Sequence, residues 1–315
     1  MSPGAAGEVI CLGIAVLDVI QRVPEPPPWG LKSVARSTEL AAGGPATNAA
    51  VTAARLLGRA TLVTALGATP AAEIVRDDLA RHGVDVVDLA DQDWELPVST
   101  CLVGDDGERT VVCVGATGTT FPLTQRARDR LAGESPRPDH TERPRAGDTP
   151  PGRRVLLLDG HHPVAAEQAL SARPEGCTAV LDAGSVKPYA ESWLARLDVV
   201  AGSADYATGL GLDLPATVRH VLAAGAGAAV MTDGPGDVHW APRGADISRT
   251  TPPRARAVDT LGAGDAFHGA LAAGLSLGFD LGAAVALGCR VASTRVGHQG
   301  ARGWLTHVAP LQGAR

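Results

Sequence analysis

Five short apolar runs, separated by segments rich in Ala, Leu and Arg, constrain the fold of this chain most strongly. They are residues 9–14, 155–159, 179–182, 198–201 and 228–232. Short, partly β-branched apolar runs are typical of buried strands, and most of the intervening segments are long enough for a helix. Strands that are apolar throughout and alternate with helices indicate a parallel sheet covered on both faces. We therefore predict a doubly wound α/β fold.

Turn residues place the ends of two of the predicted helices. Thr69 followed by Pro70 suits an N-cap and a first helical position, and Gly83 is a suitable residue just beyond the C-terminus. The pair Gly43–Gly44 likewise opens an Ala-rich segment that we expect to be helical as far as Gly58.

Two segments depart from this alternation of strands and helices. Residues 31–40 alternate weakly, and residues 98–114 read as two strands joined by a turn at Asp105–Gly107. We interpret them as a small β-sheet lid inserted into a single domain of residues 1–315. The exposed strand edges of such a lid predict a homodimer that pairs through it. Residues 135–154, rich in Pro and Arg, are predicted to form a flexible surface loop.

Composition excludes several classes of protein. Hydrophobic residues make up 45% and charged residues 20% of 315 residues, and the net charge of −6 argues against a general nucleic-acid binder. Five cysteines without C-x-x-C spacing favour free thiols in a reducing compartment. No signal peptide and no apolar run of membrane-spanning length is visible. We expect a cytoplasmic protein without a membrane or nucleic-acid partner.

The segment Asp259–Ala270, with the sequence DTLGAGDAFHGA, is the most informative part of the chain. Its glycines precede apolar residues at helical spacing, so Gly262, Ala263 and Gly264 would lie at a helix N-terminus. Backbone N–H groups and the helix dipole there form an anion hole suited to a phosphoryl group. Asp265 would stay ionised beside it and accept a hydroxyl proton. An ordinary Gly-rich turn with Asp as a helix cap is the alternative that this segment alone leaves open.

A second segment, at the opposite end of the chain, points to the same chemistry. Gly43 and Gly44 allow close backbone approach, and Asn48 in the following helix offers donors and acceptors to a polyol. Asp18 follows the first strand and would lie at the carboxyl edge of the sheet, where open α/β folds bind ligands. Taken singly, a capping Asn and a loop Asp are common for structural reasons.

In combination these residues resemble the ribokinase/phosphofructokinase-B family of carbohydrate kinases. The resemblance covers nearly the whole chain and rests on four segments in the family's order, together with the inserted β lid. The four segments are Gly13–Asp18, Gly43–Asn48, Asp259–Asp265 and Thr294–Ala301.

The resemblance implies an ATP- and Mg²⁺-dependent kinase for a small sugar, possible activation by a monovalent cation such as K⁺, and a role for each site residue. Asp265 is the expected catalytic base and Gly262, Ala263 and Gly264 the anion hole. The expected substrate-binding residues are Asp18, Gly43, Gly44 and Asn48. The expected nucleotide-binding residues are Arg109, Lys187, Thr232, Gly234, Cys289 and Ala292, and Asp205 is the expected metal contact.

Within the family, the chain is most similar to the ketohexokinase and sulfofructose kinase branches. Residues 258–265 and 203–205 are similar to the former, and residues 32–36 and 267–271 to the latter. Ser203–Tyr206 replaces the Asn-x-x-Glu motif that often helps to place magnesium, and Asp205 would substitute for it. Pro45 stands where ketohexokinases have a sugar-binding Asn, and Cys113 and His161 stand where the sulfofructose branch uses polar or basic residues. The substrate of neither branch can therefore be assigned to this chain.

Other classes lack their sequence signatures. The chain has no Gly-x-x-x-x-Gly-Lys, no complete Gly-x-Gly-x-x-Gly after the first strand, no His-Glu-x-x-His and no Gly-x-Ser-x-Gly. Two alternatives remain on the same fold. One is a nucleoside kinase, and the other is a non-catalytic nucleotide-binding regulatory protein.

Overall fold

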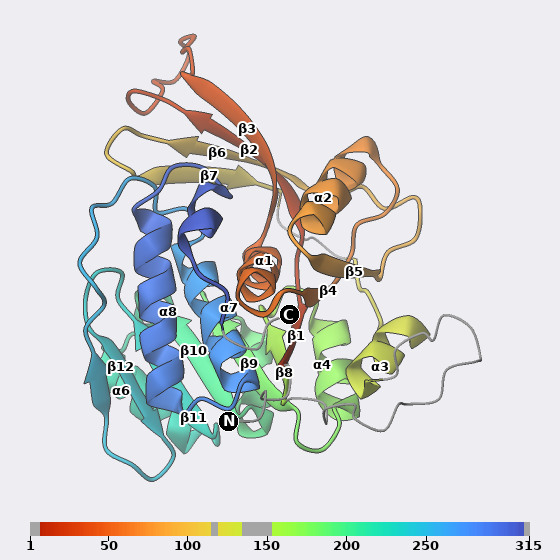
Figure 1. Ribbon diagram of the computed structural model, residues 1–315, viewed down its shortest axis with the longest axis vertical. Helices are drawn as coiled ribbons and strands as arrows, with labels where there is room; N and C mark the ends of the chain where they lie inside the picture. The colour runs from red at the N-terminus through yellow and green to blue at the C-terminus, as the bar shows by residue number, and fades with distance from the viewer. Residues whose placement is uncertain (1–6, 115–118, 134–152, 312–315) are drawn as a thin grey trace.

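A nine-stranded sheet runs through the centre of the computed structural model, which describes residues 7–114, 119–133 and 153–311 (Figure 1). The strand order is β13-β12-β11-β10-β9-β8-β1-β4-β5. The seven parallel strands are β1 (Glu8–Leu12), β4 (Ala60–Thr64), β5 (Val84–Asp88), β8 (Arg154–Leu158), β9 (Thr178–Ala183), β10 (Val199–Ser203) and β11 (Ala228–Thr232). Two antiparallel strands, β12 (Val238–Pro242) and β13 (Ser248–Thr250), complete one edge.

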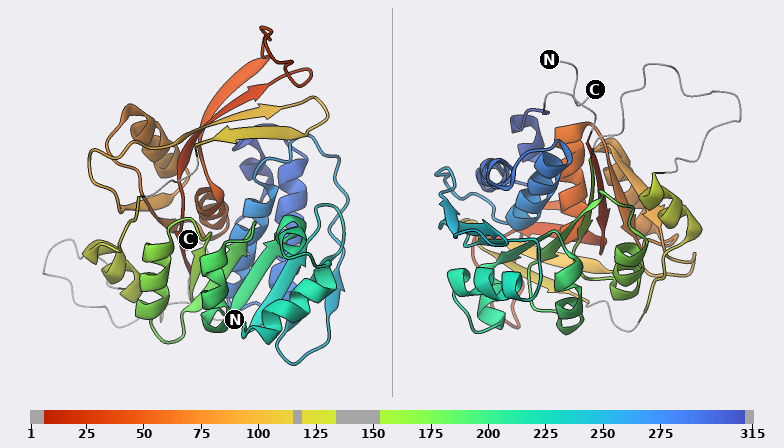
Figure 2. Two further views of the ribbon diagram at one scale, coloured as in Figure 1. Left: turned by 180° about the vertical axis from the view of Figure 1, so that it is seen from behind. Right: turned by 90° about the horizontal axis from the view of Figure 1, so that it is seen from below.

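Helices cover both faces of this sheet, because each central strand is apolar on both sides. In β1, Val9 and Cys11 face one hydrophobic core and Ile10 and Leu12 face the other. The first core is formed with α1 (Pro45–Leu57), α2 (Pro70–Arg81), α7 (Ala263–Ser276), α8 (Leu281–Val296) and η2 (Gly303–His307). The second is formed with α3 (Gln125–Ala132), α4 (Pro163–Ala172), η1 (Pro188–Arg196), α5 (Ala204–Gly209) and α6 (Leu214–Ala223). Seen from behind in Figure 2, the green helices lie on the face away from the blue α7 and α8. The predicted α/β class is confirmed.

The ends of α1 and α2 lie where the turn residues predicted them. Helix α2 spans Pro70–Arg81, and the Thr69 hydroxyl accepts a hydrogen bond from the Ala72 amide. Helix α1 begins after Gly44 and ends at Gly58, whose φ of 90° suits a residue without a side chain.

A separate four-stranded sheet extends from one end of the body, at the top of Figure 1. Its order is β3 (Ser37–Gly43), β2 (Val16–Arg22), β6 (Val98–Val103) and β7 (Arg109–Cys113). The hairpin predicted within residues 98–114 is present. The other segment differs from the prediction, because residues 31–36 are not a strand and β2 was not anticipated. The predicted loop at 135–154 falls almost entirely outside the described residues.

Two further expectations concern the cysteines and membrane segments. All five cysteines are free, and four of them are buried whereas Cys113 is exposed. Among the helices of the described residues, none combines the length and the apolar character needed to cross a membrane.

The close crossing of α1 and α7 fixes the position of the α7 N-terminus. Gly269 lies at the crossing, where a Cβ atom would come within 2.4 Å of the Ala49 carbonyl oxygen. Because that oxygen belongs to the backbone of α1, a side chain at position 269 could be accommodated only if the helices moved apart.

We predict that Gly269→Ala destabilises the fold by about 1–3 kcal/mol, the usual cost of overpacking a core. Helix propensity favours Ala over Gly by up to about 1 kcal/mol, so a net loss identifies the steric term. Urea denaturation of the variant and of wild type measures this change in the free energy of unfolding. The control Gly297→Ala, whose nearest contact for a Cβ atom is 3.5 Å away, should stay near wild type. A Gly269→Ala protein as stable as wild type would contradict the close crossing.

Candidate active site

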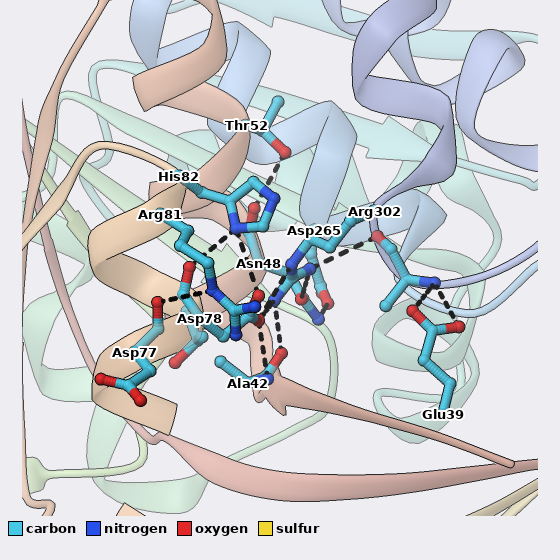
Figure 3. A network of polar contacts seen from close by, with 12 residues as sticks. Glu39, Ala42, Asn48, Thr52, Asp77, Asp78, Arg81, His82, Asp265 and Arg302 are labelled. Carbon is cyan, nitrogen blue, oxygen red and sulfur yellow. Dashed lines mark hydrogen bonds and ion pairs between the residues drawn. The ribbon is translucent and has the colours of Figure 1, made fainter. Parts of the chain in front are cut away.

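Asp265 lies in the first turn of α7, directly after the Gly-Ala-Gly loop. Gly262 is the N-cap of this helix, with a φ of 70° and no side-chain capping bond. The only side-chain hydrogen bond found for Asp265 among the described residues is accepted from Asn48 Nδ2, at 2.9 Å (Figure 3). The structure therefore disfavours the alternative in which Asp265 is simply a helix cap.

The loop before α7 presents backbone donors to an open space. The Ala263 amide donates to the Thr260 carbonyl at 3.3 Å, whereas the Gly264 and Asp265 amides have no partner within the described chain. A Cβ atom at Gly264 would meet nothing within 4 Å. Free N–H groups at the N-terminus of a long helix attract an anion, so this loop fits a phosphoryl group.

The expected substrate-binding residues come together near Asp265; they are Asp18, Gly43, Gly44 and Asn48. Asp18 is buried inside β2, and not in a loop after the first strand as the sequence suggested. Gly43, at the end of β3, packs against it so closely that a Cβ there would lie 2.1 Å from Asp18 Oδ2. Gly44, with a φ of 101°, then begins α1, which carries Asn48. Residues from opposite ends of the chain thus line one site.

Both carboxylates have pKa values above the usual range. Burial raises the pKa of Asp265 to about 6, the charge of Asp182 adds to this effect, and the hydrogen bond from Asn48 opposes it. Burial also raises the pKa of Asp18 to about 6, with the charge of Arg302 opposing and that of Asp265 adding. A carboxylate with a pKa near 6 is ionised at neutral pH and is a stronger base than an ordinary Asp.

The small sheet is held against the loop before α7 by polar contacts. Arg22, at the end of β2, donates to Asp259 Oδ2 at 2.6 Å, and the Asp259 side chain is 1% exposed. Arg109 on β7 donates to the Thr260 hydroxyl, which in turn donates to the Gly107 carbonyl of the β6–β7 turn, both at 3.0 Å. Arg109 therefore lies next to the Gly-Ala-Gly loop before α7.

The other expected nucleotide contacts come from three parts of the chain, the segment after β9, the end of β11 and helix α8. Thr232 ends β11, and Gly234 follows it with a φ of 48°. Ala292 is half-buried on α8, but Cys289 on the same helix is 2% exposed and belongs to the core. Lys187, partly exposed, donates to the Ser185 hydroxyl at 3.4 Å.

The expected cation sites differ in how well their residues fit. Asp205 is exposed in the first turn of α5, so its hard oxygens are available to Mg²⁺ and its water ligands. Within residues 7–114, 119–133 and 153–311, no cluster of three or more His, Cys, Asp or Glu side chains could hold a metal by itself. The buried carboxylate of Asp259 is paired with two arginines, Arg22 and Arg295.

Sequence reasoning missed four polar residues that support the site. Arg302 and Asp78 form an ion pair at 3.1 Å behind Asn48. Asp182 at the end of β9 and His268 on α7 form a buried pair at 3.0 Å, close enough for Asp182 to raise the pKa of Asp265. His268 lies within a predicted motif, Asp182 ends a predicted strand and Arg302 directly follows the Thr294–Ala301 segment, but Asp78 lies in a polar stretch without any motif.

Comparison with known proteins identifies the family. Residues 6–135 and 146–307 match the pfkB family carbohydrate kinase. Mouse ketohexokinase is 27% identical over 313 residues, which cover 93% of this chain and 97% of that protein. A ribokinase of Arabidopsis thaliana, solved with ribose and ATP, superposes with a TM-score of 0.75 at 19% identity, covering 98% of this chain and 97% of the other. A Thermotoga maritima ribokinase gives the same TM-score, 0.75, at 19% identity and covers 98% of both chains.

The family match spans most of the chain, and the fold agrees with it over nearly its whole length. The geometry agrees as well, because a Gly-rich loop, a helix N-terminus and a carboxylate of raised pKa lie together at the start of α7. The chain therefore belongs to the pfkB family of carbohydrate kinases and is an ATP-dependent sugar kinase.

Proposed function

We propose that this kinase phosphorylates a hydroxyl group of a ketose or furanose-like sugar, with Asp265 as the general base. The observation that carries the proposal is the environment of Asp265. One carboxylate oxygen accepts the Asn48 hydrogen bond, and the other has no hydrogen-bond partner among the described residues. This second oxygen is available to accept the proton of a sugar hydroxyl.

The remaining roles follow from position. The free amides at the start of α7, including that of Gly264, would stabilise negative charge that develops on the phosphoryl group. Bound Mg²⁺-ATP would supply that group, with Asp205 as the proposed metal contact. The residues proposed to bind the nucleotide are Arg109, Lys187, Thr232, Gly234 and Ala292. Cys289 would contribute only packing behind the site, because it is buried.

The proposed sugar specificity rests on Asp18 and Asn48. These side chains approach Asp265 from β2 and α1, and together they offer acceptors and a donor to neighbouring hydroxyl groups. A coupled ADP assay with ketoses, aldoses, sulfosugars and nucleosides tests it. A nucleoside that turns over faster than every sugar would contradict the proposal, and nucleotide binding without transfer to any acceptor would indicate a regulatory protein.

We predict that Asp265→Asn lowers turnover of the best substrate by about 10²–10⁴-fold, because Asn cannot accept the proton. Its melting temperature should stay within a few degrees of wild type, since Gly262 and not Asp265 occupies the N-cap. The matched control is Asp280→Asn, which changes a carboxylate that caps the neighbouring helix α8 and should leave turnover unchanged. Retention of more than about a tenth of wild-type turnover by Asp265→Asn would refute the base assignment.

We also propose that the chain forms a homodimer through the outer face of the small sheet. Strand register places Leu40, Val19, Thr100 and Val112 in one row across that face. Leu40 is 48% and Val112 64% exposed, whereas Ile20 and Cys101 on the inner face are buried. An apolar sheet face with two open edge strands is typical of an interface between proteins.

Replacing both Leu40 and Val112 with Asp should convert a dimer into a monomer at micromolar concentration, because two carboxylates would be buried in the interface. Sedimentation velocity measures the outcome. The control Ile74→Asp changes an exposed apolar residue on α2 and should remain dimeric. A wild-type protein that sediments as a monomer would remove this proposal.

A further inference from the structure

Arg302 lies immediately before η2 and uses all of its hydrogen-bond donors inside the protein (Figure 3). Nε and Nη2 donate to Asp78 Oδ2 at 3.2 and 3.1 Å, and Nη2 also donates to the Ala42 carbonyl at 2.6 Å. Nη1 donates to Asn48 Oδ1 at 3.1 Å and to the Ala301 carbonyl at 3.4 Å. A guanidinium group has five N–H donors, so no donor remains for a ligand. Arg302 is therefore a fixed internal cation.

Asp78 on α2 keeps Arg302 in this place. Its side chain is 8% exposed and accepts a further hydrogen bond from the Ala42 amide at 2.9 Å. Burial alone would raise the pKa of Asp78, but hydrogen bonding from His82 and the charge of Arg302 outweigh it and hold the pKa well below its usual range. The carboxylate therefore stays ionised, and the ion pair persists throughout the neutral and mildly acidic pH range.

This fixed cation determines which way the Asn48 amide points. An Asn side chain has a donating end and an accepting end of almost the same shape, and a guanidinium group can only donate. The end of Asn48 that faces Arg302 must therefore be the oxygen. The amide nitrogen then faces Asp265 Oδ2, to which it donates at 2.9 Å.

We propose that Arg302 is a positioning residue for the catalytic base, because it holds the Asn48 amide in the orientation that donates to Asp265. This inference rests on the proposed role of Asp265 as the base. The hydrogen bond stabilises the ionised form of Asp265 and leaves its other oxygen toward the acceptor hydroxyl. The network thus connects α2, η2 and α1 to the reacting atom on α7.

The pH dependence of kcat/KM distinguishes a positioning role of Arg302 from a merely structural one. The quantity compared is the acid limb, the pH at which kcat/KM falls on the acid side. Loss of a hydrogen bond to the ionised base favours its protonated form, so the acid limb should move to higher pH. The charged groups acting on Asp265 are Asp182, Asp159 and His268, and none of them is removed by changes at Arg302. The charge of Arg302 also lowers the pKa of Asp18, so only the comparison with Asn48→Ala, which keeps Arg302, assigns a shift to the hydrogen bond at Asp265. A merely structural Arg302 would affect stability without moving the limb.

Arg302→Met alone would leave Asp78 as a buried unpaired charge, so the test uses the double variant Asp78→Asn/Arg302→Met. We expect its acid limb to move up by about one pH unit, since one hydrogen bond to a charged group contributes roughly that much. Turnover below the limb should fall about tenfold and recover largely at higher pH. The matched control is Glu8→Gln/Arg154→Met, which removes another half-buried ion pair, and its limb should not move.

Asn48→Ala provides the second arm of the test. It should move the limb in the same direction, and adding Asp78→Asn/Arg302→Met to it should cause little further shift, because both changes act through one hydrogen bond. An unmoved limb in the double variant, or shifts that simply add, would overturn the inference. Asp265→Asn measured in parallel separates the two claims. Its inactivity together with an unmoved limb contradicts only the role of Arg302, whereas its activity contradicts the base assignment itself.

Discussion

The hydrogen bond between Asn48 and Asp265 connects the two ends of the chain at the point where the chemistry is proposed to occur. It can form only because α1 and α7 cross closely, with Gly269 leaving room for the Ala49 carbonyl. The same crossing places the free amides at the start of α7 beside the first turns of α1. Helix packing in the core therefore sets the geometry of the anion loop and of the base together.

The electrostatics of the site balance two carboxylates of raised pKa against internal cations. The charge of Asp265 helps to raise the pKa of Asp18, and the charge of Arg302 opposes this effect. Arg22 and Arg295 neutralise Asp259 directly before the loop. Each arginine comes from a different part of the chain, so the small sheet, α8 and the C-terminal segment are all coupled to the site. A shift of any of these elements would change the charge around the base.

Local sequence signals predicted the fold class and the ends of α1 and α2, whereas the family resemblance placed Asn48 and Asp265 in one site. Capping residues and glycines act over one helical turn, so they can be read without tertiary information. Strand β2 was missed because its polar residue, Asp18, interrupts an apolar run and suggested a loop. The burial of Asp18, which packs against Gly43 of the neighbouring strand β3, is a tertiary feature. Arg302 and Asp78 could not be found, since neither belongs to a motif and only the tertiary fold brings the residue before η2 into contact with α2.

The account depends most on Asp265 being ionised at neutral pH with a pKa near 6. Titration of the aspartate side-chain carboxyl carbons by ¹³C NMR, compared between wild type and Asp265→Asn, measures this directly. The account predicts a resonance that titrates near pH 6 in wild type and is absent from the variant. The Asp18 resonance should remain, with its pKa lowered because the charge of Asp265 no longer raises it. Because the ionised form is the base, activity should then decline as the pH falls through about 6. An Asp265 resonance that titrates near the ordinary value of about 4 would show that the carboxylate is solvated, and would contradict the account.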